Sequence, residues 1–212
     1  MAMSPTAKIS DTEMQESSAR RRKKMENPHT HYLKAVDSEL VSDDGSKGKM
    51  VGLAHWNIYG AGITDDELQV LCTTYPPPKL ELDEGTDEAF AVIAGRAWAD
   101  FFDYLTTCRR RFFTRGPTAF LNLLVVHPTA HRRGAGTMLV GWGVEKADAM
   151  GLTGFLEASR MGAPLYRKFG FEPVHQQMFD LAVYGKEFEG VHDTNYIMIR
   201  PKKGEKLEHP TV

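Results

Sequence analysis

The segment HPTAHRRGAG, residues 127–136, is a glycine-rich turn between an apolar run and a helix-forming run. Such a turn lets backbone N–H groups converge on an anion, and the helix dipole adds roughly half a positive charge at the helix start. Gly134 and Gly136 have no Cβ and allow close approach, while Arg132 and Arg133 can neutralise phosphate charge. The pattern predicts a phosphate-binding turn, with a plain strand-to-helix turn bearing solvated arginines as the alternative.

Two common phosphate motifs do not fit this turn. It lacks the GxxxxGK[ST] pattern of nucleotide triphosphatases, and it lacks the GxGxxG fingerprint within a βαβ unit that carries a ribose-binding acid. The sequence therefore gives no support for a triphosphatase or a dinucleotide-binding protein.

The elements that must position the turn are an apolar strand before it and a helix after it. Residues 119–126, AFLNLLVV, predict a central strand buried on both faces, with Asn122 as its one polar residue. Residues 137–150 predict a helix with Met138, Leu139, Trp142 and Ala147 facing inward. Downstream, we expect a strand at 153–158, a short helix at 163–169, and strands at 178–183 and 196–199.

The segments upstream of the central strand predict a helix, a hairpin and a helical region. Residues 11–25 have acidic residues at the start and basic residues at the end, as the helix dipole favours. Residues 31–36 and 50–58 predict two strands joined by a long turn. Between residues 60 and 116 we expect a short helix from Thr64 to Cys72 and a long helix that Thr86 caps.

Composition indicates an ordinary soluble globular protein. The chain has 212 residues, of which 42% are hydrophobic and 25% are charged, and a formal net charge of -2. We expect one domain at 11–201, a disordered segment at 1–10 and a flexible tail at 202–212. This charge gives no preference for nucleic acid or an anionic membrane, and the basic runs at 20–24 and 109–111 are interpreted as helix C-termini rather than nucleic-acid contacts.

The cysteines and the N-terminus bear on location and on metal binding. Cys72 and Cys108 have neither a CxxC partner nor a histidine at metal spacing, which predicts free thiols and no zinc site. No apolar run reaches the roughly 18 residues that span a bilayer, and the first ten residues lack the apolar core of a secretory signal. We expect a cytoplasmic protein, with the nucleus as the alternative.

The stretch from Leu121 to Val174 resembles the GNAT superfamily of acyl-CoA-dependent N-acetyltransferases. The family signature is Gln or Arg, two residues, Gly, one residue, then Gly or Ala, and it falls on residues 131–136, with His131 in place of the usual Gln or Arg. APLYRKFGFEPV, residues 163–174, looks like the later family segment in which a tyrosine on a short helix precedes a Gly-Phe pair. The combination of LEAS with LYRKFGFE is most similar to fungal members.

The resemblance implies an α/β fold with a GNAT-like mixed, mostly antiparallel central sheet flanked by helices. Residues 60–116 would form a helical insertion before the central strand, on the acceptor side. The first strand and helix of the family are not identifiable before Asp11. The resemblance also implies acetyl-CoA as cosubstrate, and we expect no metal. The turn would bind the pyrophosphate and the central strand the pantetheine arm, which points to Leu124, Val125, Val126, Arg132, Arg133, Gly134, Ala135, Gly136 and Thr137.

The matching tyrosine is Tyr166, which the resemblance expects to protonate the departing thiolate, with packing beside the coenzyme as the alternative. For the base we consider Glu157, because a carboxylate in a buried strand is partly desolvated. The alternatives are a structural role beside Arg160 or a backbone amide, and a relayed water as base. His127 follows as a weaker candidate, since a histidine before proline usually orders a loop.

Asn122 is a candidate for the acceptor pocket, and it cannot act as a base. His55 and Trp56 end the second hairpin strand, with packing as the main interpretation and acceptor contact as the second. We expect transfer of acetyl to a primary amine of a small molecule or peptide, in a ternary complex, by a monomer or homodimer. The alternative is a non-catalytic acyl-CoA-binding or sensor module, which His131 and the unidentified N-terminal elements motivate.

Overall fold

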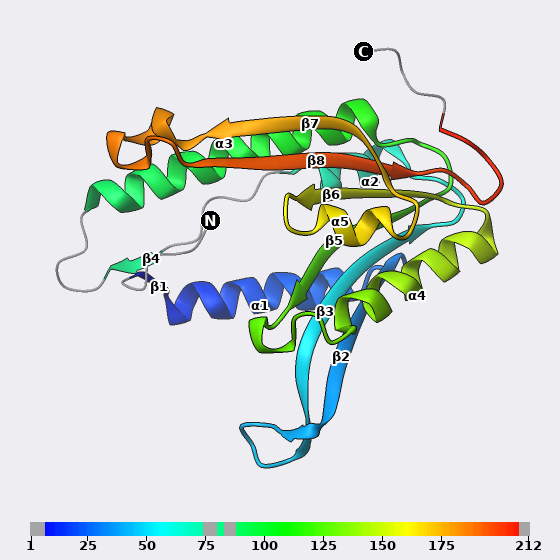
Figure 1. Ribbon diagram of the computed structural model, residues 1–212, viewed down its shortest axis with the longest axis horizontal. Coiled ribbons are helices and arrows are strands. Elements are labelled where there is room, and N and C mark those ends of the chain that lie inside the picture. The colour runs from blue at the N-terminus through cyan, green and yellow to red at the C-terminus, as the bar shows by residue number, and fades with distance from the viewer. Residues whose placement is uncertain (1–6, 74–79, 83–87, 208–212) are drawn as a thin grey trace. The chain divides into compact units, whose positions relative to one another are not determined.

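The computed structural model describes residues 7–73, 80–82 and 88–207 (Figure 1). The chain forms two compact units. We call Asn27–Thr64, Phe113–Met178 and Thr194–Val212 the core unit, and Met1–Glu26, Asp65–Phe112 and Phe179–Asp193 the helical unit. Most of the predicted insertion at 60–116 belongs to the helical unit. Within the described residues, no helix has the length and apolar character needed to cross a membrane.

A six-stranded sheet carries the fold, in the order β2-β3-β5-β6-β8-β7. The β5–β6 pair is parallel, whereas β2–β3, β3–β5 and β6–β8 are antiparallel. The expected mixed and mostly antiparallel sheet is therefore confirmed. Its strands are β2 (Thr30–Val41), β3 (Lys47–Tyr59), β5 (Thr118–Val126), β6 (Thr153–Ser159), β7 (Glu172–Asp180) and β8 (His192–Arg200).

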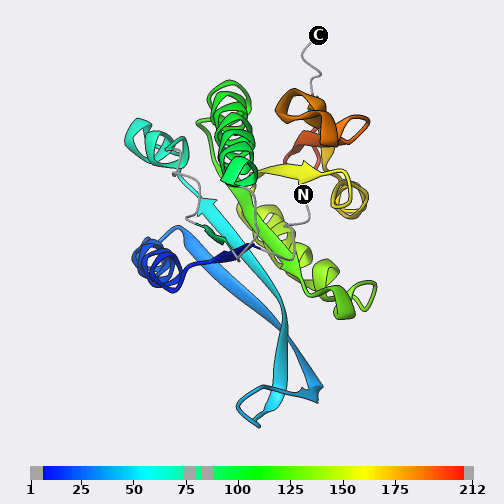
Figure 2. The same ribbon diagram turned by 90° about the vertical axis from the view of Figure 1, so that its left-hand side faces the viewer.

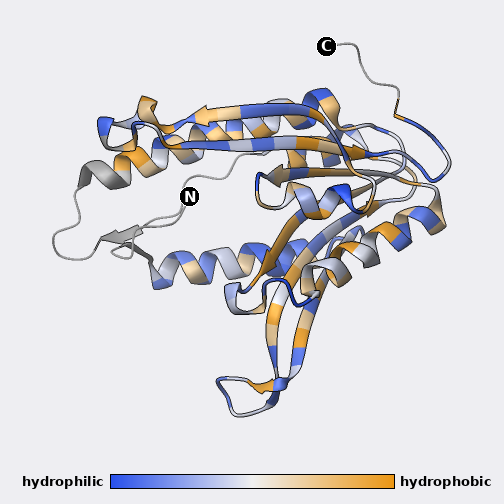
Figure 3. Ribbon diagram, viewed as in Figure 1, coloured by the Kyte–Doolittle hydropathy of each residue, from blue (hydrophilic) through white to orange (hydrophobic). Residues whose placement is uncertain are grey.

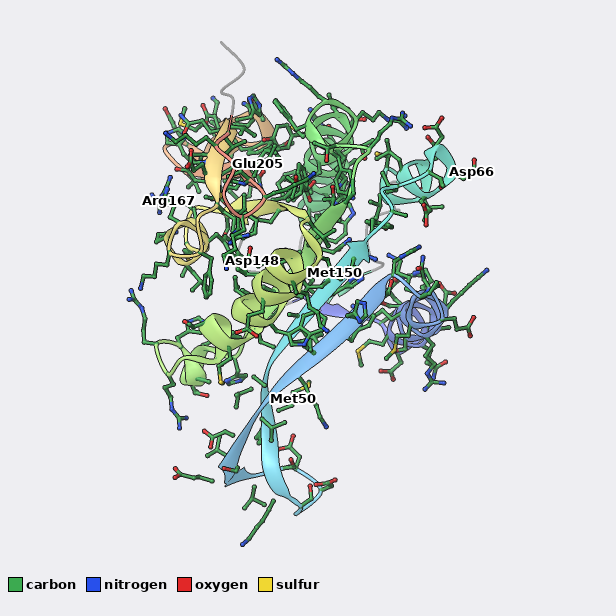
Figure 4. All side chains as sticks on the ribbon, turned by 90° about the vertical axis from the view of Figure 1, so that its right-hand side faces the viewer. Met50, Asp66, Asp148, Met150, Arg167 and Glu205 are labelled. Carbon is green, nitrogen blue, oxygen red and sulfur yellow. The ribbon has the colours of Figure 1, made fainter. Side chains whose placement is uncertain are left out.

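Helix α4 (Ala135–Met150) covers one face of this sheet, which we call the α4 face. Ala135, Leu139, Gly143 and Ala147 recur every fourth residue and are buried, so this stripe faces the strands. Met138, which we expected to face inward, lies off the stripe and is 64% exposed, so that prediction is wrong. Asp148 lies near the far end of α4 (Figure 4), and both of its carboxylate oxygens accept from Arg200 on β8, at 2.7 and 3.1 Å.

The opposite face of the sheet, which we call the Phe120 face, has an aromatic cluster at its centre. The rings of Phe120 and Phe155 meet edge to face with centroids 5.5 Å apart, and Phe113 lies 5.6 and 5.0 Å from them. Directly paired residues of neighbouring strands share a face, so Phe120 and Phe155 place every second residue of β5 and β6 on this side. The two faces therefore have separate cores.

The hairpin of β2 and β3 is longer than predicted and projects beyond the rest of the core unit (Figure 2). Its register shifts twice, between Ala35 and Val36 and again between Asp37 and Val41. Met50, on the projecting part of β3, is 56% exposed (Figure 4). Figure 3 shows apolar residues both along this hairpin and along β5.

The helical unit contains α1 (Asp11–Met25), α2 (Asp65–Leu71) and α3 (Glu88–Phe112). The bounds of α1 match the prediction, and the Ser10 hydroxyl caps it by accepting from the Glu13 N–H at 3.1 Å. Strand β1 (Ala7–Ile9) pairs with β4 (Leu80–Leu82). Strand β1 lies within the segment 1–10 that we expected to be disordered, whereas residues 1–6, Thr86 and residues 208–212 of the expected tail lie outside the described residues.

Side chains at the end of α3 join it to α2. The Arg109 guanidinium donates to the Leu71 carbonyl at 2.6 Å, and Arg110 donates to the Gln69 side chain at 3.0 Å. Cys72 and Cys108 are buried free thiols, and the Cys72 Sγ lies 3.9 Å from the Thr106 carbonyl. These contacts support a structural role for the basic run at 109–111.

The strand predicted at 178–183 is misplaced. Strand β7 runs from residue 172 to residue 180, and residues 181–184 form a 3₁₀ turn that Asp180 caps by accepting from the Ala182 N–H at 3.0 Å. As the edge strand of the sheet, β7 is largely exposed and needs no apolar alternation. Its polar sequence therefore hid it, while the apolar residues after it suggested a strand.

Candidate active site

Strands β5 and β6 diverge in the middle of the sheet, and this opening is the centre of the candidate site. Their parallel register runs from Thr118 and Thr153 to Leu121 and Leu156. Beyond that point β5 continues beside β3 to Val126, while β6 continues beside β8 to Ser159 (Figure 1). The inner edges of both strands therefore present backbone N–H and C=O groups that an extended ligand can pair with.

A β-bulge at Asn122 marks the start of the divergence. On β3, His55 pairs with Leu123 and Trp56 pairs with Leu121, so Asn122 is the extra residue of β5. The bulge follows directly after the last β5–β6 pair. Past it, Leu124 and Val126 pack toward the α4 face, whereas Leu123 and Val125 are 41% and 51% exposed. The expectation that residues 119–126 are buried on both faces is therefore wrong for the second half.

The turn after β5 is held by the two histidines of its sequence. The His127 Nδ1 lies 2.8 Å from the Thr129 hydroxyl and 3.4 Å from the Thr129 N–H, which orders the 3₁₀ turn Pro128–Ala130. The His131 Nε2 lies 2.9 Å from the Val126 carbonyl oxygen and donates to it, because a carbonyl only accepts. His131 therefore ties the turn back to the end of β5.

Two left-handed residues then carry the chain into α4. Arg132 has φ 63° and Gly134 has φ 93°, and a Cβ added at Gly134 would meet no atom within 4 Å. The first helical bond runs from the Met138 N–H to the Gly134 carbonyl at 3.0 Å. The preceding amides of Ala135, Gly136 and Thr137 have no acceptor within the helix. Together with the exposed Arg132, this geometry fits an anion such as a pyrophosphate.

Arg133 points to a different partner. Its guanidinium lies 2.8 Å from the Asp37 carboxylate on β2, whose side chain is 12% exposed. The other oxygen of this carboxylate accepts from the Glu39 N–H at 3.1 Å. The two residues also line a cavity of 300 Å³ between the hairpin and the start of α4. Both predicted phosphate-neutralising arginines are exposed, and Arg132 is the one without this ion pair.

Helix α5 (Ala163–Arg167) lies beside the start of α4 and brings Tyr166 to this region. A Cβ added at Gly136 would come 3.2 Å from Leu165 and 3.7 Å from Val126, so β5, α4 and α5 meet at this glycine. Tyr166 is 7% exposed, and burial raises the pKa of its hydroxyl to about 12. The hydroxyl therefore stays protonated at physiological pH and can act as a donor.

The remaining candidates divide between the two faces of the sheet. Glu157, on β6, is half-buried and lies on the Phe120 face, two residues after Phe155. His55 lies on the same face, buried and stacked on Tyr32 with centroids 4.5 Å apart. Asn122 is half-exposed at the bulge. Trp56 is on the α4 face.

The assignment of Trp56 to the acceptor pocket is wrong. Its side chain has no exposed surface, and its Nε1 donates to the Leu139 carbonyl of α4 at 3.2 Å. The ring fits against Gly143, where an added Cβ would come 2.1 Å from it. Trp56 therefore belongs to the core beneath α4, which was the main interpretation from the sequence.

Two tertiary contacts of the turn were not predicted from the sequence. The bonds of His131 to Val126 and of Arg133 to Asp37 have no local signal. The bulge does have a local signal in the sequence, because Asn122 is a single polar residue in an apolar strand. Across the described part of the chain, no group of three or more His, Cys, Asp or Glu side chains could hold a metal ion.

Comparison with known proteins gives one family match that spans most of the chain. Residues 9–171 match the model of the acetyltransferase (GNAT) family. No curated protein matches the sequence significantly.

Several solved structures are similar to the chain at low sequence identity. One is described as histone acetyltransferase HPA2 and related acetyltransferase from Corynebacterium glutamicum (18% identity, 93% of this chain and 80% of that chain covered, TM-score 0.49). Another is Naa20 from Chaetomium thermophilum in complex with a bisubstrate analogue (14%, 98% and 82%, 0.49). A third is NAA60 from Arabidopsis thaliana in complex with acetyl-CoA (13%, 91% and 96%, 0.45).

The family model covers well over half of the chain, and it includes the diverging strands, the left-handed turn and the tyrosine helix. This chain belongs to the GNAT family of acetyltransferases.

Proposed function

We propose that this protein transfers an acetyl group from acetyl-CoA to a primary amine by direct attack in a ternary complex. The observation that carries the proposal is the opening between β5 and β6. It ends at a turn with left-handed backbone, where the first amides of α4 have no acceptor within the helix. Membership of the acetyltransferase family supplies the reaction class. The opening would bind the extended pantetheine arm of the coenzyme, and the turn would bind its pyrophosphate.

The turn would hold the pyrophosphate of the coenzyme. The amides of Ala135, Gly136 and Thr137 donate at the helix start, and Arg132 adds charge. The inner edge of β5 from Leu124 to Val126 would pair with the amide groups of the pantetheine arm. The Val126 carbonyl is already bonded to His131, so this pairing uses the groups before it.

In the transfer step, the amine nitrogen attacks the thioester carbonyl, a C–N bond forms and the C–S bond breaks. A backbone N–H of β5 near Val126 would polarise the carbonyl oxygen. The Tyr166 hydroxyl would donate its proton toward the departing sulfur and regain one from the attacking nitrogen, which loses a proton as it becomes an amide. The raised pKa of the hydroxyl keeps it protonated before each transfer. The ammonium proton of the acceptor leaves to Glu157, directly or through a water, before the attack.

Calorimetry with acetyl-CoA tests the binding half of this proposal. We expect the wild-type protein to bind acetyl-CoA and Gly134→Asp to lose binding, because a carboxylate would stand where the pyrophosphate lies. Gly134→Asn is the matched control, since asparagine tolerates the left-handed backbone and adds no charge. Unchanged affinity in Gly134→Asp would overturn the placement of the coenzyme.

Release of free thiol tests the transfer half. With a panel of primary amines, an active enzyme releases coenzyme A in proportion to acetylated amine. Binding without any amine-dependent release would instead support the non-catalytic acyl-CoA-binding module. Tyr166→Phe should lower kcat with little change in acetyl-CoA affinity, and an unchanged kcat would exclude the acid role.

A further inference from the structure

The Phe120 face of the sheet is the side from which an acceptor can reach the opening. The other face is occupied at this point by α4 and α5, whose side chains form one core with Leu156, Ala158 and Leu124. On the Phe120 face, Leu123 and Val125 of β5 are 41% and 51% exposed. An amine attacking an acetyl group held between β5 and β6 must therefore pass over these two side chains.

Asn195 of β8 lies on this same face, next to Glu157. Asn195 pairs directly with Ser159, two residues beyond Glu157 on β6, and residues two apart on a strand share a face. Diagonal neighbours of this kind have Cα atoms about 7–8 Å apart, within reach of a common ligand. Ser159 is exposed, so this end of β6 lies at the surface.

The carboxamide oxygen of Asn195 lacks a hydrogen-bond donor. Asn195 is 7% exposed, and its Oδ1 is among the buried side-chain oxygens of the described residues that have no hydrogen-bond partner. Native folds seldom leave such an atom unpaired, and a functional role is one explanation for an exception. An ammonium group carries three donors and no acceptor, so it complements an amide oxygen beside a carboxylate.

We propose that Asn195 is an acceptor-binding residue, and that the acceptor is a monoamine with an apolar body. The inference rests on the proposed acetyl transfer. The Asn195 oxygen and the Glu157 carboxylate would hold the ammonium head, and Leu123 and Val125 would contact the carbon skeleton. Val125 pairs with Leu53 on β3, and Leu53 pairs with Lys34 on β2. Lys34 therefore lies on the same face, where it is exposed. This cation disfavours a second positive charge at the far end of the acceptor.

A matched pair of substrates tests the class of acceptor. Hexylamine and 1,6-diaminohexane have the same length and differ by one terminal ammonium. With the full-length protein and acetyl-CoA, we expect hexylamine to show a kcat/KM about tenfold or more above that of the diamine. Equal values, or a preference for the diamine, would overturn the assignment of an apolar monoamine.

The variant Asn195→Leu tests the residue. Loss of a hydrogen bond to a charged group should raise KM for hexylamine about tenfold to hundredfold, with the Kd of acetyl-CoA unchanged. The Tm should hold or rise, because leucine removes an unpaired buried oxygen. Asn195→Asp keeps an acceptor oxygen and should restore most of the affinity for the amine, which a purely structural role would not.

Asn57→Leu is the matched control. Asn57 is also a buried asparagine on the Phe120 face with an unpaired Oδ1, but it lies on β3 opposite Phe120, away from the opening. We expect it to leave the KM for hexylamine unchanged. An unchanged amine KM in Asn195→Leu would overturn the inference alone. Absence of acetyl-CoA binding in the wild-type protein would instead overturn the proposed function, and this inference with it.

Discussion

The two halves of strand β5 have the same kind of sequence and different surroundings. Thr118 to Leu121 pair with β3 on one side and β6 on the other, and all four are buried. Asn122 to Val126 keep β3 but leave β6, and two of them are substantially exposed. Apolar residues in the first half stabilise the fold, whereas those in the second half line an opening. Hydrophobicity alone does not distinguish the two roles.

The largest expected difference is in stability. Phe120→Ala should lower the free energy of unfolding by about 3–5 kcal/mol, because it leaves a cavity beside Phe113 and Phe155. Leu123→Ala should cost under about 1 kcal/mol, because the side chain is already 41% exposed. Urea denaturation measures both. Similar losses in the two variants would show that the second half is as structural as the first.

Two glycines of α4 face the two halves and should respond differently to alanine. Gly143→Ala should cost about 1–3 kcal/mol despite the better helix propensity of alanine, since its Cβ would come 2.1 Å from Trp56, which pairs with Leu121. Gly136→Ala meets the flexible end of Leu165 at 3.2 Å, and the family signature accepts alanine there. In thermal unfolding, Gly143→Ala should lower the Tm more than Gly136→Ala does. A raised Tm in Gly143→Ala would contradict the packing of Trp56.

The buried Tyr166 predicts a loss of stability at high pH. The hydroxyl of Tyr166 has a pKa of about 12 in the folded chain and about 10 in the unfolded chain. Between these values the unfolded state ionises first, so stability falls as pH rises. From pH 9 to pH 11 the loss is about 1–1.5 kcal/mol, which Tyr166→Phe should remove. Identical pH profiles of unfolding in the wild-type protein and Tyr166→Phe would show that the hydroxyl is exposed to solvent.

The smallest expected effect concerns the end of the second half. His131→Ala removes the bond to the Val126 carbonyl and should weaken acetyl-CoA binding about tenfold, with little effect on Tm because the residue is exposed. His131→Gln keeps a side-chain donor and should retain more of the affinity. Calorimetry separates the three proteins. Equal affinities for the alanine and glutamine variants would show that the bond does not hold the turn.

The sequence was informative where structure is local. Helix α1 has the predicted bounds because its charges and its ends act over a single turn. Helix α4 ends at Met150 as predicted and begins at Ala135, two residues before the predicted start at residue 137. The family resemblance placed Tyr166 on a short helix, which the structure confirms.

The sequence was uninformative where burial depends on which face of a helix, or which edge of the sheet, a residue occupies. Met138 and Leu139 are adjacent and equally apolar, but the stripe of α4 buries only the second. Strand β7 lies at an edge, where polar residues suffice. Asp37 on β2 meets Arg133, which is far away in the sequence, and Asn195 meets Ser159 only through the β6–β8 register. These pairings depend on the folded chain and leave no periodic pattern.

The place of the long connection between β3 and β5 has a consequence for the rate of folding. These strands are neighbours, with Tyr59 opposite Thr118, but the chain from Gly60 to Pro117 lies between them. Their pairing cannot propagate from a tight turn as β2–β3 can, so the loop-closure entropy must be overcome before the first contact is gained. We expect the hairpin to form early and β5 to join late. Because closure entropy grows only with the logarithm of length, the connection can vary widely among relatives with little effect on stability.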